Sequence, residues 1–137
     1  MKLTIETQWK GDMKFESDVL GHKIVMDAGT ESGGQDGGAR PKPLMLVALA
    51  GCTGMDVVSI LKKMRVEYEG LSIAVEADAR EDHPKYYEAM KVIYTFKGKD
   101  LPKEKIERAV KLSQDEYCGV SALYKKAIDL DYEIRYE

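Results

Sequence analysis

The sequence has few of the residues that bind metals or build disulfide frameworks. Among 137 residues there are two cysteines and two histidines, and neither pair has a ligand spacing such as C-x-x-C or H-x-x-x-H. Two cysteines are also a poor basis for a disulfide-stapled secreted domain, and they are more typical of reactive or inert thiols. We therefore predict no bound metal and no cofactor.

Long hydrophobic runs and an excess of positive charge are also absent. The longest apolar run, residues 44–50, is too short to cross a bilayer, so we expect no membrane partner. The first ten residues contain no apolar core of signal-peptide length, which favours a cytoplasmic protein. The net charge of −3 comes from intermixed acidic and basic residues. No basic stripe is available for a nucleic-acid backbone, so DNA and RNA are not expected partners.

The sequence does contain well-separated segments with strand or helix periodicity. Alternation of apolar and polar residues predicts strands, and apolar residues at helical spacing predict helices. The expected strands cover residues 3–9, a return strand beginning at 13–15, then 24–26, 71–79, 90–97 and 128–136, and the expected helices cover 44–65, 102–117 and 120–127. This order predicts a single α+β domain over residues 1–137, with largely antiparallel sheets around the central helix.

A glycine-rich segment, residues 28–40, separates the first three strands from the central helix. It contains five glycines and no large apolar residue, so we expect a solvated, mobile connection or a flap beside Cys52. It is not a phosphate-binding loop, because no Gly-Lys-Ser/Thr leads directly into the helix.

The central helix, residues 44–65, has no charged side chain in its first half. Such a helix is expected to be enclosed on nearly every face. One small domain offers limited area for that, so we predict that a second copy supplies part of the cover in a homodimer. Cys52 lies in this helix, and Gly51 and Gly54 beside it indicate close approach of another backbone or a substrate.

The two cysteines leave several interpretations open. A buried cysteine is often a small hydrophobic residue without chemistry. A Cys-His hydrolase would need a well-placed histidine, and His83, next to Pro84 in a polar turn, is a poor candidate. A redox pair needs only a reactive thiol, a cation that stabilises its thiolate, and a second thiol. Cys118, near the start of a predicted short helix, is suited to be that second, resolving thiol.

These residues carry a resemblance to a known family. The stretch from Pro41 to Val58, with ALAGCT around Cys52, and Cys118 in the downstream segment YCGVS, resemble the OsmC/Ohr family of thiol-dependent hydroperoxide reductases. The resemblance implies an intertwined homodimer with active sites at the subunit interface. It also implies that Cys52 attacks the peroxide, that Cys118 resolves the product, and that an external dithiol, in some members a lipoylated protein, regenerates both.

The sequence differs from the family pattern at two places. Family peroxidases carry a glutamate nine residues before the first cysteine, where this chain has Pro43. The family's catalytic arginine is expected in the first hairpin turn, which here holds Lys10 and no arginine. We predict Arg40 as the replacement cation, with Lys10 as the next candidate.

The leading hypothesis is a dithiol-dependent peroxidase for organic hydroperoxides. We expect Met45, Leu49 and Met55 to form an apolar wall near Cys52 that favours organic peroxides. The alternative is a catalytically weak or inactive dimer that binds a small hydrophobic or thiol-reactive ligand. A purely structural pair of cysteines would instead have sulfurs too far apart to cross-link.

Overall fold

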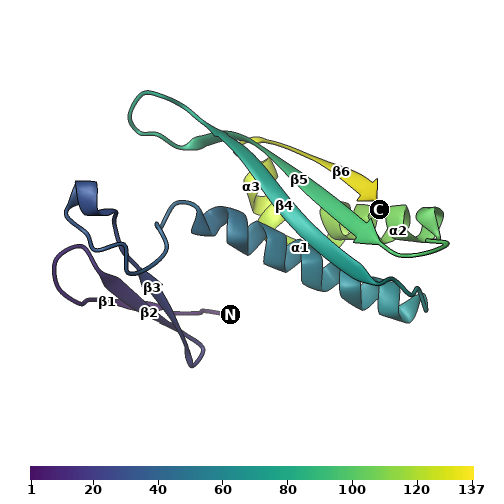
Figure 1. The fold of residues 1–137 in the computed structure, drawn as a ribbon, viewed down its shortest axis with the longest axis horizontal. Coiled ribbons are helices and arrows are strands. Elements are labelled where there is room, and N and C mark those ends of the chain that lie inside the picture. The colour runs from purple at the N-terminus through teal and green to yellow at the C-terminus, as the bar shows by residue number, and fades with distance from the viewer. The chain divides into compact units, whose positions relative to one another are not determined.

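The computed structural model describes all residues from 1 to 137, which form two compact units. One unit runs from Met1 to Met45 and the other from Leu46 to Glu137. Figure 1 shows the mixed α+β composition, with two three-stranded sheets. The α+β class predicted from the sequence is confirmed.

The N-terminal unit is the predicted meander of three antiparallel strands. Strands β1 (Glu6–Trp9), β2 (Phe15–Val19) and β3 (His22–Met26) pair in that order. The first turn depends on Gly11, whose φ of 101° lies in the region that glycine adopts without a steric penalty. The amide of Lys14 donates to the Gly11 carbonyl at 2.9 Å and closes the turn.

The glycine-rich segment after β3 is not the structureless linker that we expected. The buried carboxylate of Asp27 accepts hydrogen bonds from the amides of Ala28, Gln35 and Gly37, at 2.8, 3.2 and 3.0 Å. The bond from Gly37 is the main cause that lowers the pKa of Asp27. A short 3-10 helix, η1 (Thr30–Ser32), lies within this loop. The segment is therefore folded around one carboxylate, which composition alone did not reveal.

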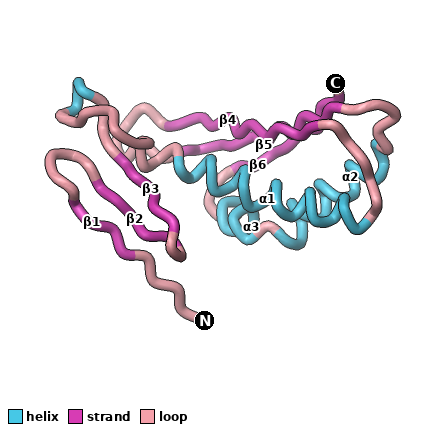
Figure 2. The backbone as a smooth tube through the Cα atoms, turned by 60° about the horizontal axis from the view of Figure 1, so that its bottom comes forward, coloured by secondary structure: helices cyan, strands magenta, loops and turns pink.

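The C-terminal unit has one sheet and the helices that connect its strands. The elements in chain order are α1 (Leu44–Lys63), which begins just before this unit, β4 (Gly70–Ala79), β5 (Tyr87–Lys97), α2 (Lys103–Leu112), the π-helical turn η2 (Ser113–Tyr117), α3 (Gly119–Lys125) and β6 (Asp129–Tyr136). Figure 2 shows α1, α2 and α3 on one face of the sheet.

The strand directions in this sheet differ in part from the expectation. Strand β4 pairs with β5 antiparallel, as predicted, but β6 pairs with β5 in parallel, with Met90 opposite Leu130. Parallel neighbours need a long crossover connection, and α2, η2 and α3 provide it. This crossover carries Cys118 across the helical face of the sheet.

Helix α1 contributes one face, not its whole surface, to the core. Its buried residues recur every four positions, at Leu49, Thr53, Val57 and Leu61. They belong to a core with buried residues of β5 and α2, namely Val92, Tyr94, Phe96, Ile106, Ala109 and Val110.

The opposite face of α1 is open. Val47, Met55 and Val58 have relative exposures of 63, 77 and 43%. A single chain therefore leaves this face of the helix uncovered, and the expected cover by a second copy stays a prediction. By length and composition α1 is long and apolar enough to cross a membrane. The sequence did not predict this, because its uninterrupted apolar run covers only residues 44–50. One face of α1 nevertheless packs in the hydrophobic core, as in a core helix.

Candidate functional site

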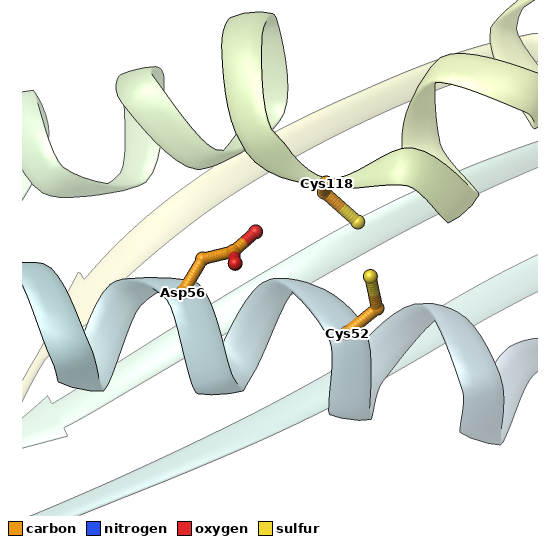
Figure 3. Close-up of side chains that lie close together, drawn as sticks. All are labelled: Cys52, Asp56 and Cys118. Carbon is orange, nitrogen blue, oxygen red and sulfur yellow. The ribbon is translucent and has the colours of Figure 1, made fainter.

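The structure brings Cys52 and Cys118 together, as the sequence predicted. Cys52 is half-buried on α1, and Cys118 is buried, with 2% exposure, just before α3. The two sulfurs and a carboxylate oxygen of Asp56 all lie within 4.8 Å of one another. Figure 3 shows the three side chains directed toward the same space. Both cysteines are free thiols.

The position of Cys118 follows from how the crossover changes direction. Helix α2 continues into the π-helical turn η2, which ends when the amide of Cys118 donates to the Ser113 carbonyl at 2.8 Å. Cys118 then adopts an extended conformation and caps α3, because its sulfur accepts a hydrogen bond from the Ser121 amide at 3.3 Å. The predicted place of Cys118 at the start of a short helix is confirmed.

Asp56 is the third member of the cluster. It lies four residues after Cys52, which places both side chains on one face of α1. The hydroxyl of Ser113 donates to Oδ2 of Asp56 at 3.0 Å and orients the carboxylate. The four-residue spacing is visible in the sequence, but no motif there indicates a role for Asp56.

A network of buried polar side chains supports this cluster. The Thr53 hydroxyl makes hydrogen bonds with the hydroxyls of Tyr94 and Ser113, at 2.6 and 2.7 Å. The amide of Gln114 donates to the Tyr94 hydroxyl at 2.7 Å, and the Ser121 hydroxyl donates to the Gln114 side chain at 3.0 Å. The network joins α1, β5, η2 and α3, so it holds the segment that carries Cys118 against α1.

The electrostatic environment of Cys52 disfavours its thiolate within this unit. Burial is the largest cause that raises the pKa of Cys52. The neighbouring thiol of Cys118 and the charge of Asp56 raise it further, while a hydrogen bond from the Val120 backbone opposes them. Cys118 and Asp56 thus both act against ionisation of Cys52, and a peroxidase would need a cation to offset them.

The two predicted cations each have a partner in the N-terminal unit. A guanidinium nitrogen of Arg40 lies 2.8 Å from a carboxylate oxygen of Asp36. The ammonium of Lys10 lies 3.7 Å from a carboxylate oxygen of Glu16. Both side chains remain about two-fifths exposed, at 43 and 44%. A role for either residue at Cys52 stays a prediction.

The open face of α1 and strand β4 form an apolar groove of about 810 Å³. Its main apolar lining residues are Val47, Met55, Val58, Leu71 and Ile73. A side chain at Gly54 would lie 2.9 Å from Ile73, so this glycine permits close packing of β4. The expected close approach of another element is thus made at Gly54 by the side chain of Ile73, whereas nothing lies within 4 Å of the corresponding position at Gly51.

The three residues expected to form an apolar wall near Cys52 do not lie on one common surface. Met55 lines the groove on the open face of α1, and Met45 is exposed at 43%. Leu49, by contrast, is fully buried in the core, because it lies on the helix face that packs against the sheet.

The fold and the cysteine pair agree with the comparison to known sequences. The chain belongs to the OsmC-like protein family, which it matches over residues 33–133. Protein YhfA of Escherichia coli K12 is 33% identical over 132 residues, which cover 93% of this chain and 94% of that protein. The resemblance to the OsmC/Ohr family is thereby confirmed.

Solved structures share the whole fold. A hypothetical protein from Aquifex aeolicus VF5 is 33% identical, with a TM-score of 0.83 over 100% of this chain and 99% of that chain. The organic hydroperoxide resistance protein OhrB of Bacillus subtilis has a TM-score of 0.63 at 22% identity, with 98% of each chain covered. At that identity the second likeness concerns the fold alone.

Proposed function

We propose that this protein is a thiol-dependent peroxidase that reduces organic hydroperoxides through a Cys52 sulfenic acid and a Cys52–Cys118 disulfide. The observation that carries the proposal is the approach of the two sulfurs to within 4.8 Å, one of them half-buried and the other fully buried. Similarity in fold to a protein named for organic hydroperoxide resistance supports the same chemistry.

The proposed reaction uses the two thiols in sequence. The Cys52 thiolate attacks the terminal peroxide oxygen, the O–O bond breaks, and the leaving alkoxide takes up a proton to become the alcohol. The Cys118 thiolate then attacks the sulfur of the Cys52 sulfenic acid. Hydroxide leaves, is protonated to water, and the disulfide forms. An external dithiol, such as a lipoylated protein, supplies two electrons and two protons to restore both thiols.

The proposal includes a homodimer and a cation. The apolar groove along α1 exposes Val47, Met55 and Val58, a face suited to a second copy of the chain. Arg40 is our candidate for the cation that offsets Asp56 and stabilises the Cys52 thiolate, and Lys10 is the next candidate. We place the protein in the cytoplasm, where dithiols keep such a pair reduced between turnovers.

A second candidate is a catalytically weak or inactive dimer that binds a small hydrophobic or thiol-reactive ligand. Two observations favour it. Burial, and to a smaller extent the carboxylate of Asp56, raise the pKa of Cys52, which lowers the fraction of the nucleophilic thiolate. The groove of about 810 Å³ is also large enough and apolar enough for a small molecule.

The proposal is tested by counting thiols after reaction with peroxide. Reduced protein receives one equivalent of cumene hydroperoxide per chain, and free thiols are then titrated under denaturing conditions. We expect both thiols of the wild-type chain to disappear, whereas Cys52→Ser should retain its single thiol. Cys118→Ser should form a sulfenic acid that dimedone traps.

Persistence of both thiols in the wild-type protein would contradict the proposed peroxidase activity. Affinity of Cys52→Ser for a hydrophobic probe would then decide the second candidate, because a binder keeps its affinity without the sulfur.

A further inference from the structure

The sequence predicted no metal site, yet the fold assembles three metal-binding side chains at one point. Cys52, Asp56 and Cys118 come from two segments 66 residues apart at the cysteines (118 − 52), and their ligand atoms lie within 4.8 Å of one another. Figure 3 shows that all three are directed into the space between α1 and the start of α3. We propose that the reduced protein binds one thiophilic divalent ion, such as Zn²⁺, through these residues.

The ligand set and its geometry suit zinc. Two thiolates and a carboxylate are ordinary zinc ligands, with Zn–S near 2.3 Å and Zn–O of about 2.0–2.2 Å. In a tetrahedral site those bond lengths place the ligand atoms about 3.6–3.8 Å apart. The cluster therefore has to contract by only about 1 Å, which small side-chain rotations achieve. Soft sulfur ligands favour zinc over Mg²⁺ or Ca²⁺.

The surroundings orient the ligands before any ion arrives. Ser113 donates to Oδ2 of Asp56, which leaves Oδ1 for the metal, and Ser113 is itself bonded to Thr53. The Ser121 amide donates to the sulfur of Cys118, which steadies that ligand. Such outer partners usually accompany protein metal ligands and contribute to affinity.

Charge also favours a cation at this position. Two thiolates and the carboxylate of Asp56 together carry a charge of −3, which a divalent ion reduces to −1. Binding releases the two thiol protons to solvent. Three protein ligands leave a fourth coordination position that water or a small ligand would fill.

Metal binding and disulfide formation use the same two sulfurs and are therefore mutually exclusive. The ion would protect the reduced pair, and the disulfide form would not bind it. The inference does not depend on the proposed peroxidase, because the reduced cluster binds the ion whether or not Cys52 reacts with peroxide.

The test is a titration of reduced, metal-free, full-length protein with Co²⁺ under anaerobic conditions. We expect a sulfur-to-cobalt charge-transfer band that saturates at one ion per chain and disappears when Zn²⁺ is added. Cys52→Ser and Cys118→Ser should each lose most of the band. Asp56→Asn should weaken affinity by about tenfold or more, since loss of an outer partner alone costs that much.

The control is Asp82→Asn, which changes an exposed loop carboxylate in the same way and should leave the affinity unchanged. Protein oxidised with diamide should bind no cobalt. Absence of the band in the wild-type protein would overturn the proposal, as would a band of full intensity in both cysteine variants. An unchanged affinity in Asp56→Asn would show that this carboxylate is not a ligand of the ion. No peroxide is used, so these results are independent of the test of the proposed function.

Discussion

At the scale of single residues, the chemistry of Cys52 depends on what its neighbours do to its thiol. Burial is the main cause that raises the pKa of Cys52, and the charge of Asp56, which lies on the same face of α1 close to both sulfurs, raises it further. A reactive thiol needs the opposite influence. The charge of Asp56 thus adds to the effect of burial against a peroxidase, whereas a metal site can use this carboxylate as a ligand.

Replacing Asp56 by asparagine should make Cys52 easier to ionise. The carboxylate raises the Cys52 pKa, so its removal lowers that pKa and increases the thiolate fraction near neutral pH. We expect the rate of Cys52 alkylation by iodoacetamide, followed by mass spectrometry against pH, to shift toward lower pH. Asp115→Asn, which neutralises an exposed carboxylate of η2, serves as the control and should leave the profile in place. A shift toward higher pH would contradict the assignment.

The sequence was informative about some residues of the site and silent about others. Cys52 and Cys118 were predicted because a reactive pair is chemically distinctive and because the residues around Cys52 resemble a known family. Thr53, Ser113 and Gln114 were not predicted, since isolated hydroxyl and amide residues have no motif. Their role arises only when α1, β5 and η2 bring them into contact.

At the scale of elements, the buried hydroxyl of Thr53 connects three parts of the C-terminal unit. It makes hydrogen bonds with the hydroxyls of Tyr94 in β5 and Ser113 in η2. Thr53 lies on the core face of α1, next to Cys52 in the sequence. Each buried hydrogen bond of this kind contributes about 0.5–1.5 kcal/mol to stability. The position of the crossover that carries Cys118 therefore depends on a side chain outside the cysteine pair.

Substitution of Thr53 by valine should destabilise the protein. Valine has nearly the same shape but removes the hydrogen bonds of Thr53 to the hydroxyls of Tyr94 and Ser113, which keep Gln114 and Asp56 as partners. We therefore expect a loss of about 0.5–1.5 kcal/mol per lost hydrogen bond in the free energy of unfolding. Urea denaturation followed by circular dichroism measures it. Thr53→Ser keeps the hydroxyl and should recover most of the loss. Equal stability of the valine variant and the wild type would show that the network contributes little.

The elements themselves were largely predictable, but their neighbours were not. Alternation in residues 128–136 predicted β6 correctly, since period two identifies a strand and its faces. It does not indicate which strand lies alongside or in which direction, so the parallel pairing with β5 was missed. The folded structure of the loop around Asp27 was missed for a similar reason. The sequence shows a glycine-rich segment there, but it does not show that backbone amides of this segment donate hydrogen bonds to one carboxylate.

At the scale of the whole molecule, the open face of α1 supports the proposed dimer. Met55 is 77% exposed and lines the apolar groove on this face. Large exposed apolar patches commonly mark interaction surfaces. The uncharged first half of α1, which predicted enclosure, is consistent with a cover supplied from outside the chain.

A charge on this face should prevent self-association. We expect the wild-type protein to have twice its chain mass of 15.4 kDa in light scattering coupled to size exclusion, and Met55→Glu to shift toward 15.4 kDa. Burial of an unpaired carboxylate in an apolar interface is costly, which is the reason for the expected effect. Leu123→Glu, at a residue 65% exposed on α3, is the matched control and should remain dimeric. A wild-type mass of 15.4 kDa would contradict the proposed dimer.

The crossover that places Cys118 beside Cys52 also couples oxidation to folding. A bond between these sulfurs would close a ring that runs from residue 52 to residue 118 and contains β4, β5 and α2. Confining the unfolded chain in a ring of that size lowers its conformational entropy by an amount worth about 4 kcal/mol. By linkage, the native fold then favours the cross-linked form over the open form by the same amount. The disulfide is therefore harder to reduce in the folded protein than in the unfolded chain.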